Sequence, residues 1–567
     1  MPDSRGLALA CVAVATWSLA AIPTGCHRSP TPPIGAAHGP DASPVRGGTL
    51  RLASFKDIRN LDPAGPGDGL SLPIQHQIFA GLVDLDARGR VVADLAERWE
   101  IVDEGRTVRF FLRPGVVMQD GRELDATDIK RSAERALHPS APNPTASYYE
   151  GIDGYRDFVS GAADHIAGIV VEGRTVLSFR LEHPDATFLP LLGMMALRPV
   201  CRTAGERYDD TWSPCGAGPF RLERGGWQPA IGVRLVRHEA YFRPGLPYLD
   251  AIEWTFNMDP LAQRFRFESG DLDVVSDLAE ADQARFNGDP LWRPFGSSEG
   301  DTRLYGEAMN TRMPPFDNVE VRRAVAAAID RDHYRLLRPG RMTALTQPIP
   351  PGIDGYDSSL DGQRYDQAAA LDHMRRAGYP YEPSTGAGGW PKPIAYPLYD
   401  QGLLMFTAQL LQQDLAKIGL RIELRLMSWQ AFLALQMRPD GAALSQGNWE
   451  MDYPDASSFL EPLFTTNALP PAGDNIAFYS NPVVDDLTAR ARQEMDPDRR
   501  RRLYRHASRI LCEDAPWAFA YSYHFFYLHQ PYVRGYAPHA VFHLDATQVW
   551  VDRKPAGIRS SPLGRSF

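Results

Sequence analysis

The chain has 567 residues, which corresponds to three or four domains at about 150 residues each. Its hydrophobic fraction of 44% and charged fraction of 23% are typical of packed globular proteins and exclude a disordered or multispanning chain. Asp and Glu outnumber Lys and Arg by 70 to 60, so nucleic acid is not an expected partner. The five cysteines include no CxxC pair, which excludes a disulfide scaffold and a thiolate zinc site.

The N-terminus has the features of an export signal. Arg5 precedes an apolar run over residues 7–22, which is shorter than the roughly 20 residues that a membrane-crossing helix needs. The alternative is a short buried helix, but the next segment, 27–47, holds five prolines and is poorly suited to pack around one. We therefore predict a signal peptide over residues 1–26 and a Pro-rich linker after it.

The predicted signal ends in Thr-Gly-Cys, which resembles the end of a bacterial lipobox. In a lipobox, the cysteine, here Cys26, becomes the lipidated first residue of the mature protein. Pro23 stands where an aliphatic residue is expected, so lipidation and ordinary cleavage both remain open. Either outcome places the protein in the periplasm or at the cell envelope.

Export gives the later cysteines a different meaning. Cys201 and Cys215 flank a short polar segment and are free to form a disulfide in an oxidising compartment. Cys512 lies in an apolar helical stretch and is expected to be a buried structural thiol.

The first half of the mature chain predicts short strands, loops and one capped helix. Asp125 precedes apolar residues at Ile129, Ala133 and Leu137, which have helical spacing. Asp120-Gly121 is the residue pair of a tight hairpin. The expected strands cover 48–53, 107–112 and 175–181, and a Gly-rich loop follows the first of them and runs through Gly69.

From about residue 300 the pattern changes to helices that alternate with strands. A helical apolar stripe follows Asn318. A βαβ unit is predicted from a strand at 394–396, a helix at 403–418 and a strand at 421–427. The right-handed crossover of such units predicts an α/β lobe. A last helix is expected at 498–512, followed by an aromatic, strand-like run at 517–528.

Catalytic motifs are missing from the sequence. There is no HExxH, GxSxG, Walker loop or strand-anchored GxGxxG, so no enzyme class is indicated. His76, near the Gly-rich loop, is either an acid/base group or, as we prefer, a solvated or hydrogen-bonded histidine. The four residues Arg499 to Arg502 are expected to form a solvated helix face rather than an anion site.

Asp452 is the one carboxylate that the sequence singles out. It lies between the large aromatic residues Trp449 and Tyr453. A desolvated carboxylate needs a cation, and the ammonium group of a ligand provides one through charge-assisted hydrogen bonds. The alternative is an aspartate that caps the helix expected at 456–460.

Several blocks of sequence closely resemble the solute-binding proteins of peptide/nickel ABC importers, family 5 of the bacterial extracellular solute-binding proteins, which include dipeptide- and oligopeptide-binding proteins. The blocks occur in the expected order between about residues 48 and 536. They are 80–83, 95–100, 111–116, 120–121, Asp128, 215–220, 241–250, 269–273, 314–317, 321–324 and 328–331.

The resemblance implies an α/β protein with the type II periplasmic-binding fold, in which a hinge joins two lobes. The implied domains are lobe I at 48–80, 185–298 and 522–567, a subdomain inserted in lobe I at 81–184, and lobe II at 299–521. This agrees with the β-rich first half and the α/β second half.

The resemblance also implies a binding function without catalysis, cofactor or metal. A monomer captures a peptide between its lobes, closes around it and delivers it to the membrane permease of an ABC importer. The same fold binding a nickel chelate, haem, glutathione, oligosaccharide or opine is the main alternative. An exported hydrolase or a sensory binding protein is the third.

In the dipeptide and oligopeptide binders, an aspartate at the place of Asp452 pairs with the free α-ammonium of the peptide. By the same resemblance, Trp449 is expected to wall the pocket, with Tyr453 beside it, and the backbone around Glu450 to pair with the ligand main chain.

Further implied contacts are Gly67 and Gly69, in the segment 64–70, and Tyr148. Gln446 replaces an arginine that pairs with the peptide carboxylate in some relatives, which leaves open whether a ligand carboxylate is needed.

Overall fold

The computed structural model describes residues 43–65, 69–205, 212–276, 278–298, 300, 302–399 and 403–552. The predicted signal peptide, Cys26 and Gly67 therefore lie outside the described residues. Over these ranges the structure has no helix with the length and apolar character needed to cross a bilayer.

The first unit is built on a four-stranded sheet whose first strand follows the predicted linker. In spatial order its strands are β1 (Thr49–Ala53), β10 (Ala251–Thr255), β9 (Gly232–Arg237) and β8 (Phe220–Gln228). The β1–β10 pair is parallel, and the fully buried Leu50 and Ile252 are register partners. The helices of this unit are α1 (Leu72–Ile78), α5 (Pro260–Glu268) and α6 (Glu280–Gly288).

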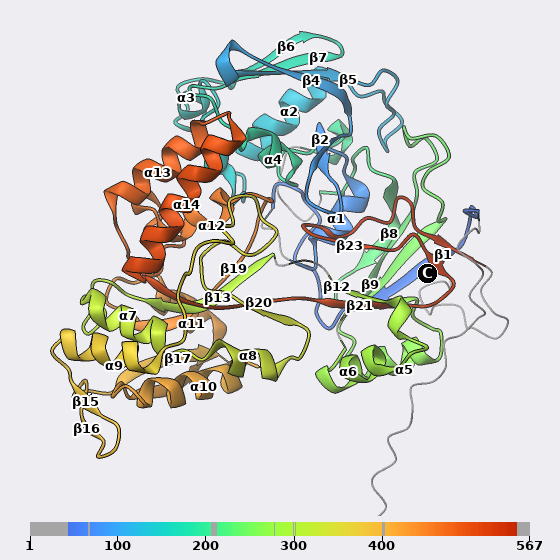
Figure 1. Cartoon of the computed structure of the whole chain (residues 1–567). Coiled ribbons are helices and arrows are strands. Elements are labelled where there is room, and N and C mark those ends of the chain that lie inside the picture. The colour runs from blue at the N-terminus through green and yellow to red at the C-terminus, as the bar shows by residue number, and fades with distance from the viewer. Residues whose placement is uncertain are drawn as a thin grey trace, which may run out of the picture.

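The second unit, at the top of Figure 1, has an antiparallel sheet covered by a capped helix. Its strands, in spatial order, are β4 (Ala96–Val102), β5 (Thr107–Leu112), β7 (Val176–Arg180) and β6 (Ile169–Gly173). Asp125 and Asp128 form a capping box at the start of α2 (Ala126–Leu137), as the sequence predicted for Asp125. The unit also contains β2 (Val83–Leu85), β3 (Val91–Ala93), α3 (Tyr155–Val159) and α4 (Phe188–Gly193). Its core includes Phe188 and Cys201, so the packing of this unit extends past residue 184.

The third unit contains the predicted βαβ motif. β17 (Ile394–Tyr399) and β18 (Ile422–Met427) are parallel and are joined by α10 (Leu404–Ala416). Beside them lies a four-stranded sheet in the order β14 (Met342–Ala344), β20 (Trp517–Tyr523), β13 (Arg303–Met309) and β19 (Leu444–Glu450). The surrounding elements are α7 (Val319–Ala328), α8 (Arg331–Leu337), α9 (Gln367–Arg376), β15 (Tyr381–Glu382), β16 (Ala387–Gly388) and α11 (Trp429–Gln436).

Two crossings connect the first and third units. The chain passes from β12 (Gly296–Ser298) to β13, and it returns from β20 to β21 (Phe526–His529). β21 pairs with β11 (Val274–Val275) and β12, whereas β20 pairs with β13 and β14. The strand-like run expected over 517–528 consists of two strands, which run on nearly in line but belong to different sheets (Figure 1).

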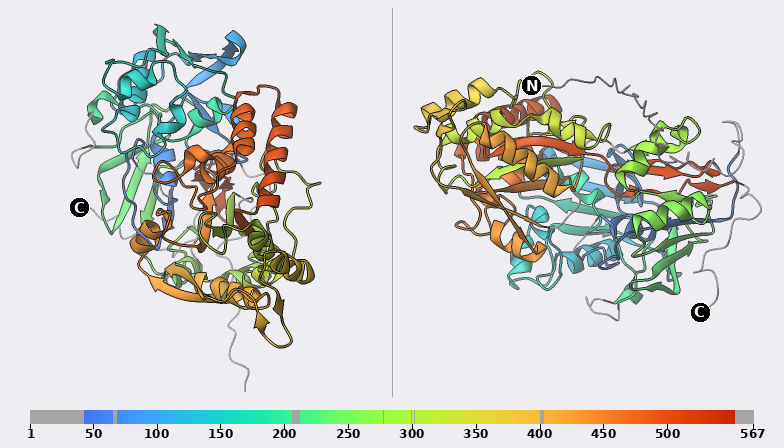
Figure 2. Two further views of the ribbon diagram at one scale, coloured as in Figure 1. Left: turned by 90° about the vertical axis from the view of Figure 1, so that its left-hand side faces the viewer. Right: turned by 90° about the horizontal axis from the view of Figure 1, so that it is seen from below.

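Three helices between β19 and β20 form a separate layer, and the last two of them lie side by side (Figure 2). They are α12 (Ser457–Phe464), α13 (Pro482–Gln493) and α14 (Pro497–Asp514). On α14, Arg500 is buried and forms a bidentate ion pair with Asp455. The expectation of a solvated face for all four arginines was thus wrong for Arg500, because the buried carboxylate of Asp455 requires a cationic partner.

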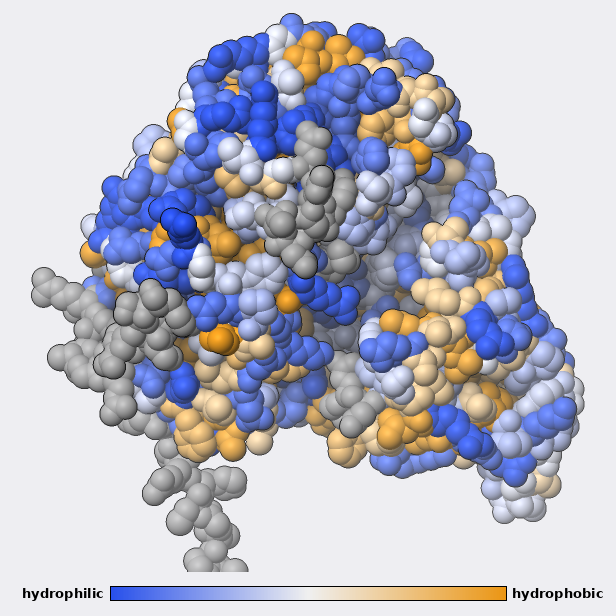
Figure 3. Space-filling view, turned by 180° about the vertical axis from the view of Figure 1, so that it is seen from behind, coloured by the Kyte–Doolittle hydropathy of each residue, from blue (hydrophilic) through white to orange (hydrophobic). Residues whose placement is uncertain are grey.

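The C-terminal segment returns to the first unit in short paired strands. These are β22 (Val533–Arg534) with β25 (Trp550–Val551), and β23 (Pro538–His539) with β24 (His543–Leu544). The side chain of Gln77, in α1, donates to the carbonyl of Leu544 over 2.9 Å, which fixes this segment against α1. Seen from behind, the surface is mostly hydrophilic, with hydrophobic patches along its lower edge (Figure 3).

Candidate functional site

A cavity of about 240 Å³ lies where all three units meet. Segments that are far apart in the sequence line it: the loop before α1 and its first turns, the chain after α2, the chain after α4, the end of β19, and the β23–β24 turn. Its lining residues are Pro63, Gly65, Gly69, Leu72, Gln75, Asn143, Pro144, Thr145, Met194, Met195, Ala196, Glu450, Met451, Asp452, Val541, Phe542 and His543. A concave, largely apolar site with a few polar groups is typical of small-molecule binding.

Asp452 provides a carboxylate to this cavity. The phenol of Tyr148 donates to its Oδ2 over 2.7 Å, and its own backbone N–H donates to Ser458 Oγ over 2.9 Å. Burial raises the pKa of Asp452 to about 6, in spite of the hydrogen bond from Tyr148, and the negative charges of Asp474 and Glu450 add to the rise. Among the described residues, no cationic side chain pairs with this carboxylate.

The neighbouring Asp455 excludes the capping alternative for Asp452. Asp455 accepts the backbone N–H of Ser457, in the first turn of α12, over 2.8 Å and is neutralised by Arg500. Asp455, rather than Asp452, thus binds the start of α12. Asp452, three residues earlier, is left facing the cavity.

Glu450 is the second carboxylate of the lining, but it has a protein partner. It pairs with Arg303, and its Oε1 lies 3.6 Å from Nε2 of His543. Glu450, the last residue of β19, and Asp452 both line the cavity, whereas Trp449 does not. In the part of the chain that the structure describes, no lysine or arginine lines the cavity.

The two aromatic residues next to Asp452 support the site from outside the lining. Trp449 packs against the large core, and its indole N–H donates to the carbonyl of Ser458 over 2.6 Å. Tyr453 is buried, and its hydroxyl lies 2.9 Å from Ser457 Oγ. Trp449 was expected to form a wall of the pocket, but its ring faces α12 and it does not line the described cavity.

Of the other predicted residues, Gly69 lines the cavity and Tyr148 stands behind it, in contact with Asp452. Arg492, on α13, holds Tyr148 in place: it donates to the carbonyl of Tyr148 over 2.9 Å, to Asp185 over 3.0 Å and to Glu461 over 3.1 Å. Sequence reasoning missed Arg492. No local motif marks it, since its partners come together only in the folded chain.

His543 and the residues after α4 that complete the lining were also not predicted from the sequence. His543 has φ of 61°, in the left-handed region, which directs its ring from a tight turn. The run Met194 to Ala196 is one apolar stretch among many in the sequence. Only tertiary packing distinguishes these residues from ordinary core positions.

His76 lies outside the lining and has a structural role in the described fold. It is buried, with Nε2 3.1 Å from Asp84 Oδ2 and Nδ1 3.3 Å from the carbonyl oxygen of Leu544. Its ring stacks on Phe542 at a centroid distance of 4.2 Å. His76 thus supports the turn that lines the cavity.

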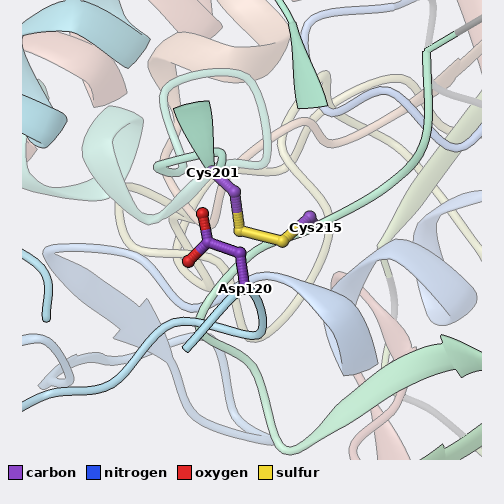
Figure 4. Close-up of side chains that lie close together, drawn as sticks. All are labelled: Asp120, Cys201 and Cys215. Carbon is purple, nitrogen blue, oxygen red and sulfur yellow. A yellow bond between two sulfur atoms is a disulfide. The ribbon is translucent and has the colours of Figure 1, made fainter. Parts of the chain in front are cut away.

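Cys201 and Cys215 form a disulfide, with a Cα–Cα distance of 5.4 Å (Figure 4). Asp120 lies close to the two sulfur atoms, and the three residues form a group with metal-ligand chemistry. The sulfur atoms are bonded to each other, however, and provide no thiolate. Asp120 accepts hydrogen bonds from Arg122 and Thr203 instead.

Comparisons with known proteins agree with the sequence blocks. The family model described as bacterial extracellular solute-binding proteins, family 5 Middle, matches residues 90–470, more than half of the chain. The glutathione-binding protein GsiB of Escherichia coli O6:K15:H31 is 27% identical over 473 residues, which cover 82% of this chain and 87% of the relative.

Solved structures establish the fold. Clavulanic acid biosynthesis oligopeptide binding protein 2 matches with a TM-score of 0.81 at 24% identity, over 93% of this chain and 99% of that one. The periplasmic binding protein DppA from Helicobacter pylori, in complex with the peptide STSA, matches with a TM-score of 0.72 at 23% identity, over 90% and 99%. The predicted α/β class and type II periplasmic-binding fold are confirmed.

Proposed function

Because the chain belongs to family 5 of the bacterial extracellular solute-binding proteins, we propose that it captures peptides outside the cytoplasm for an ABC importer. The observation that carries the choice of a peptide is the carboxylate of Asp452, which lines the cavity and has no cationic partner among the described side chains. The free α-ammonium of a peptide supplies the missing cation.

Binding follows from closure of the two lobes. The lobes hinge at the two crossings, between β12 and β13 and between β20 and β21, close to the predicted borders at 298–299 and 521–522. The closed form brings Tyr148, from the second unit, onto Asp452, at the end of β19. A peptide that contacts both sides shifts the equilibrium towards the closed form by its differential affinity, and the closed form docks on the permease.

No bond of the solute is broken, and the protein acts as a monomer. The signal peptide directs it to the periplasm, where a lipid on Cys26 anchors it and the linker over residues 27–47 spaces it from the membrane.

Glutathione is the second candidate ligand, because the GsiB relatives bind it by name. It carries an α-ammonium for Asp452 but also two carboxylates. Among the described residues, the cavity lining has two carboxylates and, as the one side chain able to carry positive charge, His543. Charge complementarity therefore favours a peptide with fewer acidic groups.

The test compares trialanine with N-acetyl-trialanine by isothermal titration calorimetry. We expect the acetylated peptide to bind at least tenfold more weakly, which corresponds to about 1.4 kcal/mol. Asp452→Asn should abolish this difference, whereas Asp474→Asn, which removes a nearby negative charge outside the lining, should keep it. Equal affinity of the wild-type protein for both peptides would contradict the proposal, and recovery of hydrolysed peptide would favour an enzyme.

A further inference from the structure

A second, smaller chamber of about 90 Å³ adjoins the cavity. It lies in the first unit, next to the crossing from β20 to β21. Its lining residues are Leu52, Ala53, Ser54, Ile58, Gly69, Leu70, Pro73, Ile74, Trp254, Phe256, Val274, Ser276, Phe525, Tyr527, Tyr536, His543 and Leu544. Apart from His543, thirteen of these residues have apolar or aromatic side chains, so the chamber is mainly hydrophobic.

Gly69 and His543 lie at the border between the chamber and the cavity that contains Asp452, because both residues line both spaces. A Cβ atom placed on Gly69 would lie 3.8 Å from Nε2 of His543, which is ordinary van der Waals contact. The absence of a side chain at Gly69 therefore leaves room for about one carbon atom beside the imidazole. The ring is held between Glu450, at 3.6 Å, and the hydroxyl of Tyr527, at 3.4 Å.

The lining and size of the chamber define the group that fits it. Ile74, Trp254, Phe256 and Val274 are at most 5% exposed, so the chamber walls belong to the packed core. An apolar cavity of about 150 Å³ holds a benzene molecule. A chamber of about 90 Å³ is smaller and suits an aliphatic side chain better than an aromatic one.

We propose that this chamber is a subsite for one aliphatic side chain of the bound peptide, which enters between Gly69 and His543 while the peptide ammonium pairs with Asp452. The inference rests on the proposed function and adds a substrate class to it. The favourable contribution comes from removing the side chain from water, so it adds to the affinity without requiring a further polar contact.

The experiment measures the affinities of Gly-Gly-Gly, Leu-Gly-Gly, Gly-Leu-Gly and Gly-Gly-Leu for the purified protein. We expect one leucine position to bind at least tenfold more tightly than Gly-Gly-Gly, as burial of a leucine side chain allows. Phenylalanine at that position should gain less. Ala53→Leu, which fills the chamber from the end of β1, should remove the gain and leave the affinity for Gly-Gly-Gly unchanged.

The outcomes separate the subsite from the proposed function. If Gly-Gly-Gly binds but no leucine position improves the affinity, the subsite is refuted and peptide binding stands. If phenylalanine gains as much as leucine, or if Ala53→Leu binds Gly-Gly-Gly and keeps the gain, the size argument is wrong. If none of the four peptides binds, the proposed function fails and the subsite fails with it.

Discussion

Replacing Asp452 by asparagine should stabilise the unliganded protein while it weakens peptide binding. Burial raises the pKa of this carboxyl from 3.8 to about 6. A tenfold change in proton affinity corresponds to about 1.4 kcal/mol, so ionising this buried group costs the folded state about 2–3 kcal/mol at pH 7. Asparagine has nearly the same shape, carries no charge, and can still accept the hydrogen bond from Tyr148.

The sign of this effect depends on pH in a defined way. A raised pKa means that the folded state binds the proton more tightly, so the protein gains stability from this group as the pH falls through 6. The advantage of Asp452→Asn should therefore be largest at pH 7 and above and should fall below about 1 kcal/mol at pH 4. Urea unfolding at several pH values measures it. Destabilisation at pH 7 would refute the reasoning, because it would mean that the protein itself stabilises the ionised form.

Three other changes test the surroundings of the site. The peptide affinity of the wild-type protein should fall about tenfold between pH 7 and pH 5, because the pKa of Asp452 is about 6. The hydrogen bond from Tyr148 lowers this pKa, so Tyr148→Phe should move the midpoint of the affinity change to higher pH. An unchanged midpoint in calorimetric titrations would contradict this. Arg492→Met should lower the urea unfolding free energy by about 1.5–3 kcal/mol, since it leaves the partly buried carboxylates of Asp185 and Glu461 without their shared cation; a loss below about 1 kcal/mol would mean that the bridge behaves as an exposed one. Replacing Cys201 and Cys215 by alanine should cost about 3 kcal/mol, as expected for a closed loop of this length; unchanged stability under non-reducing conditions would argue against the bond.

Local sequence signals predicted much of the fold. The capping residue Asp125 marks the start of α2, and the βαβ unit at β17, α10 and β18 lies within a few residues of its expected ranges. Such features depend on neighbours in the sequence. The run from Trp517 to Leu528 was expected to be strand-like. Such a pattern carries no information about which sheet each part joins, and the structure divides the run between two sheets.

The candidate site was predicted less completely, for the same physical reason. Asp452 was found because its aromatic neighbours and the family block mark it. Arg492 contacts Tyr148, which lies 344 residues away in the sequence, and His543 contacts Glu450. Nothing in the sequence next to Arg492 or His543 indicates these contacts. Gly69 was expected at the cleft, but its position opposite His543 becomes visible only in the fold.

A crystal structure of the protein with trialanine tests the central claim most directly. The account predicts an intact peptide in the cavity, with its amino nitrogen within hydrogen-bonding distance, about 2.7–3.2 Å, of the Asp452 carboxylate and with Tyr148 still in contact with that carboxylate. A peptide bound outside this cavity, or with its amino end directed away from Asp452, would contradict it.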